Sequence, residues 1–318
     1  MKQTPSLSVV MPVYNGGVFL AEAIESIIGQ TFEDFEFVIV DNNSTDGSTD
    51  TVRDYARQDS RIRTLFINRR GIAHAVNAGF RQARGHWVAR ADQDDISHAS
   101  RFQTQIEWIH SAGLDVCGCC YENFGSKEGK VWCPESHEAI GREMLFRVVV
   151  IAGATMMRTE IAQDNAYLED VLLDDYEWPI RMRTKARFGN VPAVLLKRRC
   201  HEQQTSRRMT GRIKTERKKY RFRHFYEMYP HTPLPDYLAL ARISDRQPMS
   251  SLAELHRAGQ WLVELARQHD PLLRKRMARR WKETCERSIA LSDECEAIFQ
   301  KYLEQIDIAD DNDGYEHL

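Results

Sequence analysis

Three carboxylates stand close together at Asp92, Asp94 and Asp95, directly after the apolar residues 86–89. Carboxylates this close raise one another's pKa unless a cation lies among them. Hard cations such as Mg²⁺, Mn²⁺ or Ca²⁺ bind carboxylate oxygens, and a diphosphate can complete their coordination. An isolated D-x-D-D can equally be a solvated acidic turn. Its position after a buried strand favours a ligand site, because open α/β sheets bind ligands at the carboxyl ends of their strands.

The elements that precede this cluster alternate between short apolar runs and helical patterns. Continuous apolar runs are typical of strands buried on both faces of a parallel sheet. The alternation predicts an α/β, Rossmann-like and mostly parallel central sheet flanked by helices. The predicted strands are 7–13, 35–40, 62–67 and the run before Asp92, and the predicted helices are about 20–28, about 49–57 and the stretch from Gly71 to Ala83.

The ends of three of these strands should meet at one edge of the sheet. These ends are Pro12 to Asn15, Asp41, and the cluster from Asp92 to Asp95. Nucleotide binding at that edge is the natural inference. The sequence lacks G-x-G-x-x-G after the first strand and has no G-x-x-x-x-G-K-[ST], which disfavours dinucleotide oxidoreductases and P-loop phosphotransferases. A metal ion would therefore have to hold a diphosphate here.

The whole chain has the composition of an ordinary globular protein: 318 residues, 42% hydrophobic, 28% charged, with a formal net charge of -2. No apolar run approaches the roughly 20 residues of a spanning helix, and no signal peptide is recognisable. Seven unevenly spaced cysteines indicate reduced thiols and a cytoplasmic compartment. A zinc site made by Cys117, Cys119, Cys120, Cys133 and His137 is an alternative, but the spacing fits no zinc knuckle, and residues 114–120 read as a buried strand.

Eight short motifs follow one another along the chain: SVVMPVYN (8–15), QTF (30–32), VDNNSTDGS (40–48), GIAHAVNAG (71–79), ARG (83–85), ARADQDDIS (89–97), LDDYEW (173–178) and RCHEQQTS (199–206). With these motifs the chain resembles family 2 glycosyltransferases of the GT-A fold over roughly residues 6–206. Each motif alone is weak, but the set is specific because the order and spacing are those of the family.

This resemblance implies sugar transfer, with inversion, from a nucleotide diphosphate to an acceptor hydroxyl, and it implies Mn²⁺ or Mg²⁺. The implied metal ligands are Asp94 and His201, with Asp92 beside them and closer to the ribose. The implied base is Asp175, with Asp174 as the alternative, and a helix from 175 to 187 would help to keep it ionised. The implied donor-binding residues are Pro12, Tyr14, Asn15, Asp41, Asn77, Asp92 and Gln93.

Three positions depart from the family pattern without removing a required charge. Asn42-Asn43 replaces the commoner Asp-Gly, Asp174 stands where Glu is usual, and Gln93 is bulkier than the usual Ala or Ser. We expect Asn42 and Gln93 to alter the choice of donor.

The predicted domains are a catalytic domain at 1–206, a helical domain at 207–306 and a disordered acidic tail at 307–318. The donor-binding half is about 1–95 and the acceptor half about 96–206. Residues 207–223 contain nine Lys or Arg, which suit anionic lipid head groups or a phosphate-bearing acceptor, or form a solvated face. Apolar stripes at Leu252 to Leu265 and Leu273 to Cys285 should pack on each other, on the catalytic domain or on a second subunit.

The sequence thus predicts an inverting, metal-dependent glycosyltransferase that builds a bacterial surface polysaccharide or lipid-linked glycan. The expected donor is a UDP-sugar, the expected place is the cytoplasm or the inner face of its membrane, and no nucleic acid is expected. A non-catalytic GT-A scaffold that binds a membrane or polyanion through the basic helices is the alternative. A nucleotidyltransferase is disfavoured because its glycine-rich N-terminal loop is missing.

Overall fold

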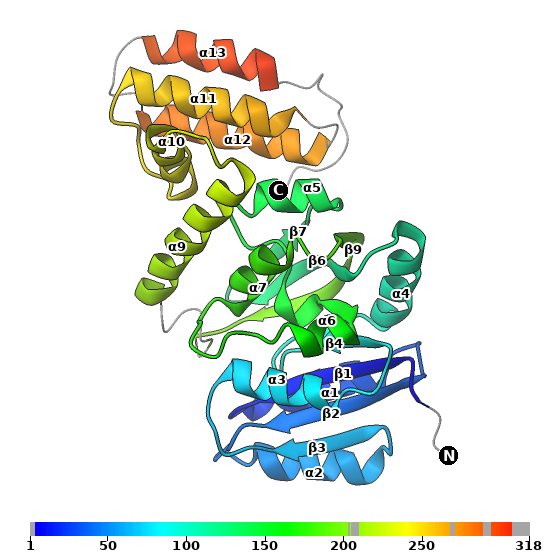
Figure 1. Ribbon diagram of the computed structural model, residues 1–318. Helices are drawn as coiled ribbons and strands as arrows, with labels where there is room; N and C mark the ends of the chain where they lie inside the picture. Colours follow the sequence, from blue (N-terminus) through cyan, green and yellow to red (C-terminus); the bar gives the residue numbers. More distant parts are fainter. Residues whose placement is uncertain (1–3, 203, 205–209, 268–270, 289–293, 307–318) are drawn as a thin grey trace. The chain divides into compact units, whose positions relative to one another are not determined.

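The computed structural model describes residues 4–202, 204, 210–267, 271–288 and 294–306, which form two compact units. The first, the sheet unit, contains the chain up to His137 together with Val150–Ile213 (Figure 1). The second, the helical unit, contains Glu138–Val149 and the described residues from Lys214 onward. The short segment 138–149 thus leaves the sheet unit to join helices that come much later in the sequence.

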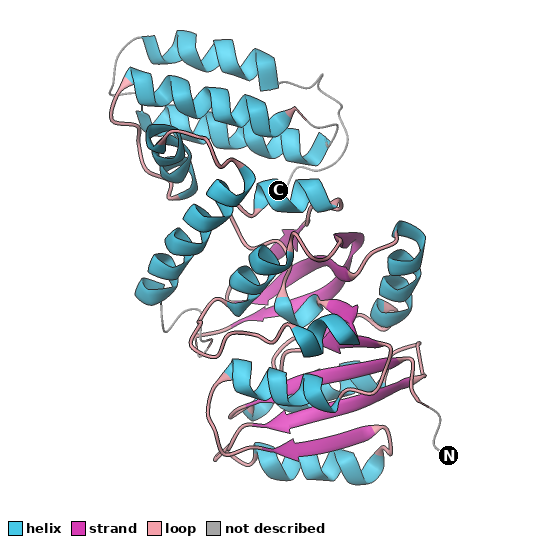
Figure 2. Ribbon diagram, viewed as in Figure 1, coloured by secondary structure: helices cyan, strands magenta, loops and turns pink. Residues whose placement is uncertain are grey.

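All strands of the described residues, drawn in magenta in Figure 2, belong to one sheet in the sheet unit. Their order is β3-β2-β1-β4-β8-β6-β9-β5, with β7 paired to β6. Their bounds are β1 (Leu7–Val13), β2 (Phe35–Asp41), β3 (Ile62–Phe66), β4 (Trp87–Arg90), β5 (Ile96–Ser97), β6 (Val116–Gly125), β7 (Gly129–Val131), β8 (Met156–Arg158) and β9 (Phe188–Cys200).

The first half of the sheet is parallel and buried. β1, β2 and β4 are buried at every position, as their continuous apolar runs predict. β1 pairs with β2 on one side and with β4 on the other. The chain therefore turns to opposite sides of β1, and the carboxyl ends of these strands meet at a topological switch point, where open sheets bind ligands.

The second half of the sheet is mixed. β8 is antiparallel to β4 and β6, while β6 and β9 are parallel. β5 is antiparallel to β9, with Ile96 opposite Lys197. This short pairing brings the end of β9 next to the residues that follow β4. The predicted fold class, a GT-A-like α/β sheet flanked by helices, is confirmed.

Helices cover both faces of the sheet, and others form the helical unit. In the sheet unit they are η1 (Gly17–Phe19), α1 (Leu20–Ile28), α2 (Ser48–Gln58), α3 (Ile72–Gln82), α4 (Arg101–Ala112), η2 (Ala152–Ala154), α6 (Thr159–Asp164) and α7 (Asp174–Met182). The others are α5 (His137–Glu143), α9 (Thr210–Met228), α10 (Leu234–Ser244), α11 (Leu252–Ala266), α12 (Pro271–Ser288) and α13 (Glu294–Ile306). No helix among the described residues is long and apolar enough to cross a bilayer.

The predicted apolar stripes of α11 and α12 form the core of the helical unit. Leu255 and Leu262 of α11 are buried with Leu273, Met277 and Trp281 of α12 in one cluster. The two stripes therefore pack on each other within a single chain.

The basic helix α9 is not uniformly exposed. Arg221 is only 2% exposed, and its Nη1 lies 3.0 Å from Oδ1 of Asp245, which also pairs with Lys218. Arg221 is therefore not part of the exposed basic surface, because it is buried in an ion pair with Asp245, which directly follows α10. Arg212, Lys214 and Lys219 are exposed.

Candidate active site

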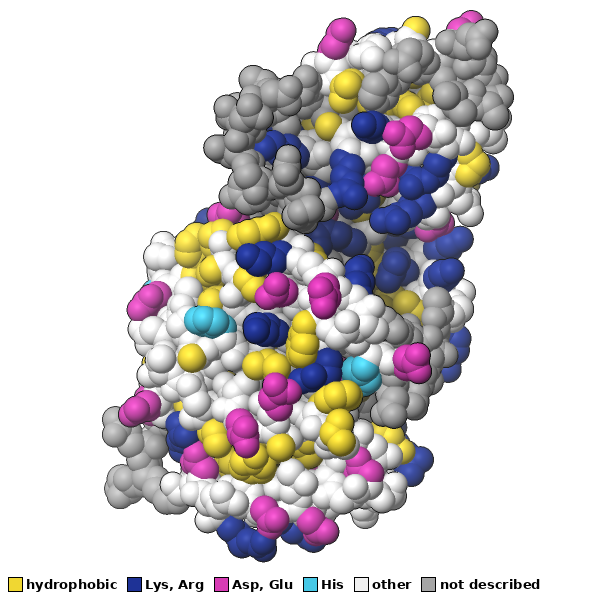
Figure 3. Space-filling model, turned by 180° about the vertical axis from the view of Figure 1, so that it is seen from behind, with side chains coloured by type: hydrophobic (Ala, Val, Ile, Leu, Met, Phe, Trp, Pro, Cys, Tyr) yellow, Lys and Arg dark blue, Asp and Glu magenta, His cyan; other side chains and the backbone are white. Residues whose placement is uncertain are grey.

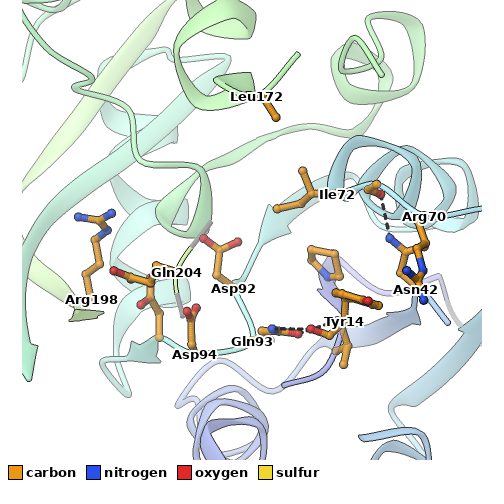
Figure 4. Close-up of a pocket in the computed structure, with 14 residues that line it drawn as sticks. Tyr14, Asn42, Arg70, Ile72, Asp92, Gln93, Asp94, Leu172, Arg198 and Gln204 are labelled. Atoms are coloured by element: carbon orange, nitrogen blue, oxygen red, sulfur yellow. Dashed lines mark hydrogen bonds between the residues drawn. The ribbon is translucent and has the colours of Figure 1, made fainter. Parts of the chain in front are cut away.

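A cavity of about 430 Å³ opens at the carboxyl edge of β1, β2 and β4, within the sheet unit (Figure 4). The residues that line it come from these strand ends, from the start of α3 and from the end of β9. They are Pro12, Val13, Tyr14, Asn42, Arg70, Gly71, Ile72, Asp92, Gln93, Asp94, Asp95, Leu172, Arg198 and Gln204.

The cavity has two chemically different ends, which Figure 4 shows on either side of Gln93. Asp92, Asp94, Arg198 and Gln204 form the charged end, and the other end contains Tyr14, Asn42, Arg70 and Ile72. Between them, Oε1 of Gln93 accepts a hydrogen bond of 2.7 Å from the Tyr14 amide, and Nε2 donates one of 3.1 Å to the Tyr14 carbonyl. The bulky side chain of Gln93 thus connects the end of β1 to the loop after β4 through two hydrogen bonds.

At the charged end, Nε2 of His201 lies 2.8 Å from Oδ2 of Asp94, although the two residues are 107 positions apart. The pairing of β5 with β9 explains this contact, because it places the residues after β9 opposite those before β5. Arg199 completes the junction: its amide donates to Oδ1 of Asp95 at 2.9 Å, and its Nε donates to the Asp94 carbonyl at 3.0 Å.

The Asp94–His201 pair fits two neighbouring positions around a small divalent cation. With octahedral Mg²⁺ bonds of about 2.1 Å, adjacent ligand atoms lie about 3 Å apart, close to the distance in this pair. Among the described residues, no three His, Cys, Asp or Glu side chains form a group that could hold a metal ion. Asp92 therefore does not complete a three-residue site, and a cation here would need oxygens from a diphosphate and water.

The same observation weakens the zinc alternative, since the described cysteines do not converge on one point with histidine or acidic residues. Cys117, Cys119 and Cys120 are buried in β6. Burial raises the pKa of the Cys117 and Cys119 thiols above their usual values, which disfavours the thiolate that zinc needs. His137 accepts a hydrogen bond from the Phe188 amide instead.

Arg90, at the end of β4, links Asp92 to the start of α7. Its side chain is 2% exposed; Nη1 donates to Oδ2 of Asp174 at 2.6 Å, and Nε donates to Oδ1 of Asp92 at 3.3 Å. Asp174 is thus paired with a buried cation. In the described part of the chain, no hydrogen bond or ion pair is found for the neighbouring Asp175 carboxylate. The structure therefore distinguishes two carboxylates that are adjacent in sequence.

The environment of Asp175 favours its protonated form more than the sequence suggested. Burial, followed by the negative charge of Asp174, raises the pKa of Asp175 to about 7, against the opposing charges of Arg90 and Arg198. α7 spans only Asp174–Met182, and burial outweighs the expected effect of its N-terminus. Burial together with the charges of Asp92 and Asp94 also raises the pKa of Asp95 well above its usual value.

Pro12, Tyr14, Asp92 and Gln93 line the cavity, whereas the other predicted donor-binding residues do not. Asn77 exchanges two hydrogen bonds of 2.9 Å with the backbone of Tyr167. Asp41 accepts hydrogen bonds from the Ser44 amide and the Thr49 hydroxyl. Asn15, which has a positive φ of 49°, accepts one from the Thr45 amide. These three side chains hold the loops that shape the cavity.

The sequence analysis assigned no role in the site to several lining residues, among them Arg70, Ile72, Leu172 and Arg198. Arg70 and Ile72 flank Gly71, so the glycine turn before α3 was a usable signal. Gly71 itself has φ 132°, and an added Cβ would lie 2.8 Å from the His74 ring, so only glycine fits there. Arg198 and Leu172 carry no local signal, because they reach the cavity only through the fold.

Gly153 of η2 positions Asp92 by close approach. A Cβ added at Gly153 would lie 2.7 Å from Oδ2 of Asp92. We expect Gly153→Ala to displace this carboxylate and to lower kcat/KM for donor turnover by about 10- to 100-fold, since a shift of about 1 Å in a site has effects of that size. Gly211→Ala is the control, because nothing lies within 4 Å of its added Cβ. Equal rates for the two variants would show that Asp92 tolerates the displacement.

Comparisons with known proteins agree with this architecture. The model of the family described as "Glycosyl transferase family 2" matches residues 8–164. The uncharacterized glycosyltransferase EpsJ of Bacillus subtilis (strain 168) is 33% identical over 135 residues, which are 42% of this chain. The chain spans only 39% of the length of EpsJ.

Two solved structures share the fold at low sequence identity. S. aureus TarS 1-349 in complex with UDP has a TM-score of 0.57 and 17% identity, with 96% of this chain and 94% of that chain covered. Mannosyltransferase PcManGT from Pyrobaculum calidifontis, in complex with GDP-Man and Mn²⁺, has a TM-score of 0.56 and 19% identity, with 96% and 86% covered. The family model matches just under half of the chain, and we therefore assign residues 8–164 to glycosyltransferase family 2.

Proposed function

We propose that this protein is an inverting, metal-dependent glycosyltransferase that moves a hexose from a nucleotide-diphospho-sugar to an acceptor hydroxyl. One observation carries the proposal: Asp94, which pairs with His201, lines a cavity at the switch point of the sheet. The same cavity wall is joined, through Asp92 and Arg90, to the carboxylate of Asp174 at the start of α7.

The two ends of the cavity suit the two ends of a nucleotide-sugar. The charged end offers ligands for a cation that would hold the diphosphate, and the other end offers aromatic and apolar surface for a base. TarS was solved with UDP and PcManGT with GDP-Man and Mn²⁺. We place a UDP-sugar first among the donors and Mn²⁺ or Mg²⁺ as the cation, held by Asp94 and His201.

The chain's own residues would perform the transfer as follows. Asp175 accepts the proton of the acceptor hydroxyl while that oxygen bonds to the anomeric carbon, and the bond from this carbon to the diphosphate breaks. Attack from the side opposite to the leaving diphosphate inverts the configuration. A bound cation would neutralise the charge that develops on the diphosphate. Asp174, paired with Arg90, would orient the start of α7.

A screen of nucleotide-sugars tests this function. The purified chain is heated with UDP-, GDP-, dTDP- and CDP-sugars in the presence of Mn²⁺, and donor hydrolysis is measured in parallel. At least one donor should raise the melting temperature and be hydrolysed slowly. If no donor does either with Mn²⁺ or Mg²⁺, the non-catalytic scaffold becomes the better reading.

We propose that the acceptor belongs to a bacterial surface polysaccharide or a lipid-linked glycan, and that the protein meets an anionic membrane from its cytoplasmic side. Lys and Arg side chains gather on the helical unit (Figure 3). Large apolar side chains are also exposed on two helices of this unit: Phe222 of α9 is 45% exposed and Leu234 of α10 is 52% exposed. Cations beside exposed aromatic and leucine side chains are typical of surfaces that bind anionic bilayers.

Replacing Arg212, Lys214 and Lys219 by Gln should weaken binding to anionic vesicles by about tenfold or more at low salt, since each cation contributes about 1 kcal/mol near such a surface. The difference should shrink as salt is raised, because the Debye length shortens. Sedimentation with phosphatidylserine vesicles at several salt concentrations measures the loss of binding and its dependence on salt.

The control replaces Arg53, Arg57 and Arg267, which are exposed cations on other helices or helix ends. Its vesicle binding should stay near that of the parent. Absence of parent binding even at low salt would contradict the membrane proposal. The α9 cations would then serve solvation or a phosphate-bearing acceptor.

A further inference from the structure

Three arginine side chains of the helical unit converge on one oxygen of a buried carboxylate. The carboxylate belongs to Glu143 at the end of α5, which is 0% exposed. Its Oε2 lies 2.8 Å from Nε of Arg147, 3.2 Å from Nη1 of Arg276 and 3.7 Å from Nη2 of Arg280. We call these four residues the arginine cluster. It joins the segment 138–149 to α12 within the helical unit.

The geometry of the arginine cluster is not that of an ordinary structural ion pair. A guanidinium that pairs with a carboxylate commonly bonds both of its oxygens. Here all three cations gather at Oε2 of Glu143, while Oε1 is buried and has no hydrogen-bond partner among the described residues. One arginine would be sufficient to neutralise Glu143 and to connect the segment to α12. Pairing with Glu143 therefore does not explain why three like charges lie together.

The arginine cluster carries an excess of positive charge. Burial alone would raise the pKa of Glu143, but the three neighbouring cations lower it to about 2, so this carboxylate is ionised at neutral pH. One negative charge thus faces three positive charges. Burial lowers the pKa of Arg280 from its usual value, and the attraction of Glu143 does not compensate for it. The charges of Arg147 and Arg276 lower this pKa further, whereas Glu283 acts in the opposite direction.

Glu283 does not balance this excess, because it serves other cations. Its carboxylate already pairs with Arg279 at 3.2 Å and with Arg287 at 3.3 Å.

The arginine cluster is held in place but is not sealed from solvent. The side chains of Arg147, Arg276 and Arg280 are 25%, 12% and 22% exposed. Cζ of Arg280 lies 4.1 Å from the centroid of the Phe146 ring, which supports one face of the guanidinium. Guanidinium groups that are already fixed lose little entropy when they bind an anion, and partial burial strengthens the attraction. An oxyanion can therefore reach a preformed cationic site.

We propose that the arginine cluster binds a phosphoryl group that carries two negative charges. Guanidinium groups match phosphate oxygens in bidentate geometry, and two charges balance those that Glu143 leaves over. This inference goes beyond the proposed sugar transfer, because the cluster belongs to the helical unit and contributes no residue to the cavity of the sheet unit. A soluble phosphate and the head group of phosphatidic acid both present such a phosphoryl group, and the experiments below distinguish these two sources.

Melting curves of the full chain test the site, with inorganic phosphate as the probe and chloride at the same ionic strength as the reference. Phosphate at about 10 mM should raise the melting temperature by about 2 °C or more, since a ligand that binds only the native state stabilises it.

Two substitutions assign the effect to the arginine cluster. Arg276→Gln and Arg280→Gln each leave two cations at Glu143, and each should lose most of the phosphate shift. Arg279→Gln is the matched control, because Arg279 lies beside Arg280 on α12 but is 62% exposed and pairs with Glu283. This control should keep the shift of the parent. If the arginines serve only to connect α12, the two cluster variants will melt lower in chloride and in phosphate alike, and the phosphate shift will survive. That result would overturn the inference.

Vesicle sedimentation distinguishes the two sources of the phosphoryl group. If a lipid supplies it, the parent should bind phosphatidic acid vesicles at least about fivefold more tightly than phosphatidylserine vesicles of equal surface charge, because the phosphomonoester exposes more oxygens to bidentate bonding. Arg280→Gln should lose this preference, and Arg279→Gln should keep it. A phosphate shift without a lipid preference supports a soluble source. Absence of both in the parent would overturn the inference, while the screen of nucleotide-sugars tests the proposed function separately.

Discussion

Replacing Asp175 by Asn is expected to lower the rate of sugar transfer by about 100-fold or more, while donor affinity stays within a few-fold of the parent. The amide keeps the shape of the side chain but cannot accept the proton of the acceptor hydroxyl. Steady-state turnover and nucleotide titration separate the two effects. Asp174→Asn is the informative comparison. If that variant loses turnover and Asp175→Asn does not, the roles of the two aspartates must be exchanged.

The pH dependence provides a second measurement of the same carboxylate. Because the pKa of Asp175 is raised to about 7, about half of the free enzyme has an ionised base at neutral pH. The value of kcat/KM should therefore rise as pH increases through about 7 and level off above it, and this step should be absent in Asp175→Asn. A flat profile for the parent protein between pH 5.5 and 8.5 would argue against Asp175 as the base.

The stability of the fold should depend on pH in the opposite direction to kcat/KM. The native-state pKa of Asp175 lies above the usual value of 3.8, so between these values the native state binds more protons than the unfolded state. The contribution of Asp175 to the free energy of unfolding therefore falls as pH rises through this window. Asp175→Asn should stabilise the fold at neutral pH by about 1 kcal/mol, the size common when a functional residue is removed. Asp174→Asn should destabilise it, because the buried Arg90 loses the nearer of its two charged partners.

Asp94→Ala is expected to abolish turnover while the protein remains folded, and a chelator should do the same to the parent. Asp94 and His201 are the pair that would hold the cation, and removing one of two protein ligands leaves His201 alone. Activity of the chelated parent should return with Mn²⁺ or Mg²⁺. Donor hydrolysis with and without chelator measures turnover, and circular dichroism checks the fold.

A readout that does not need catalysis makes this test sharper. Mn²⁺ should increase the thermal stabilisation by UDP in the parent but not in Asp94→Ala. Asp50→Ala is the matched control, since the side chain of Asp50 is 82% exposed and lies on α2. Full turnover by Asp94→Ala in the presence of chelator would remove the metal from the mechanism.

The sequence alone determined the parts of this protein that depend on local pattern. Runs of apolar residues identify β1, β2 and the strand before Asp92, because a strand buried on both faces needs apolar side chains at every position. The order of motifs from residue 8 to residue 206 was sufficient to recognise the family. The carboxylates from Asp92 to Asp95 could be placed at a strand end, since only the preceding few residues decide this.

Tertiary structure decided which of these side chains are free to act. Asp174 and Asp175 are equivalent as neighbours in sequence, but Arg90, 84 residues earlier, pairs with only one of them. In the sequence Arg221 looks like the other cations of α9, but in the structure it is buried and pairs with Asp245. The Nδ2 group of Asn42 donates to the Gly71 carbonyl, and this bond leaves the Asn42 amide oxygen without a partner among the described residues. Each of these outcomes depends on a partner that is distant in the chain. The pKa of a side chain and its freedom to bind a ligand follow from such partners and from burial, and neither can be read from composition or motif spacing.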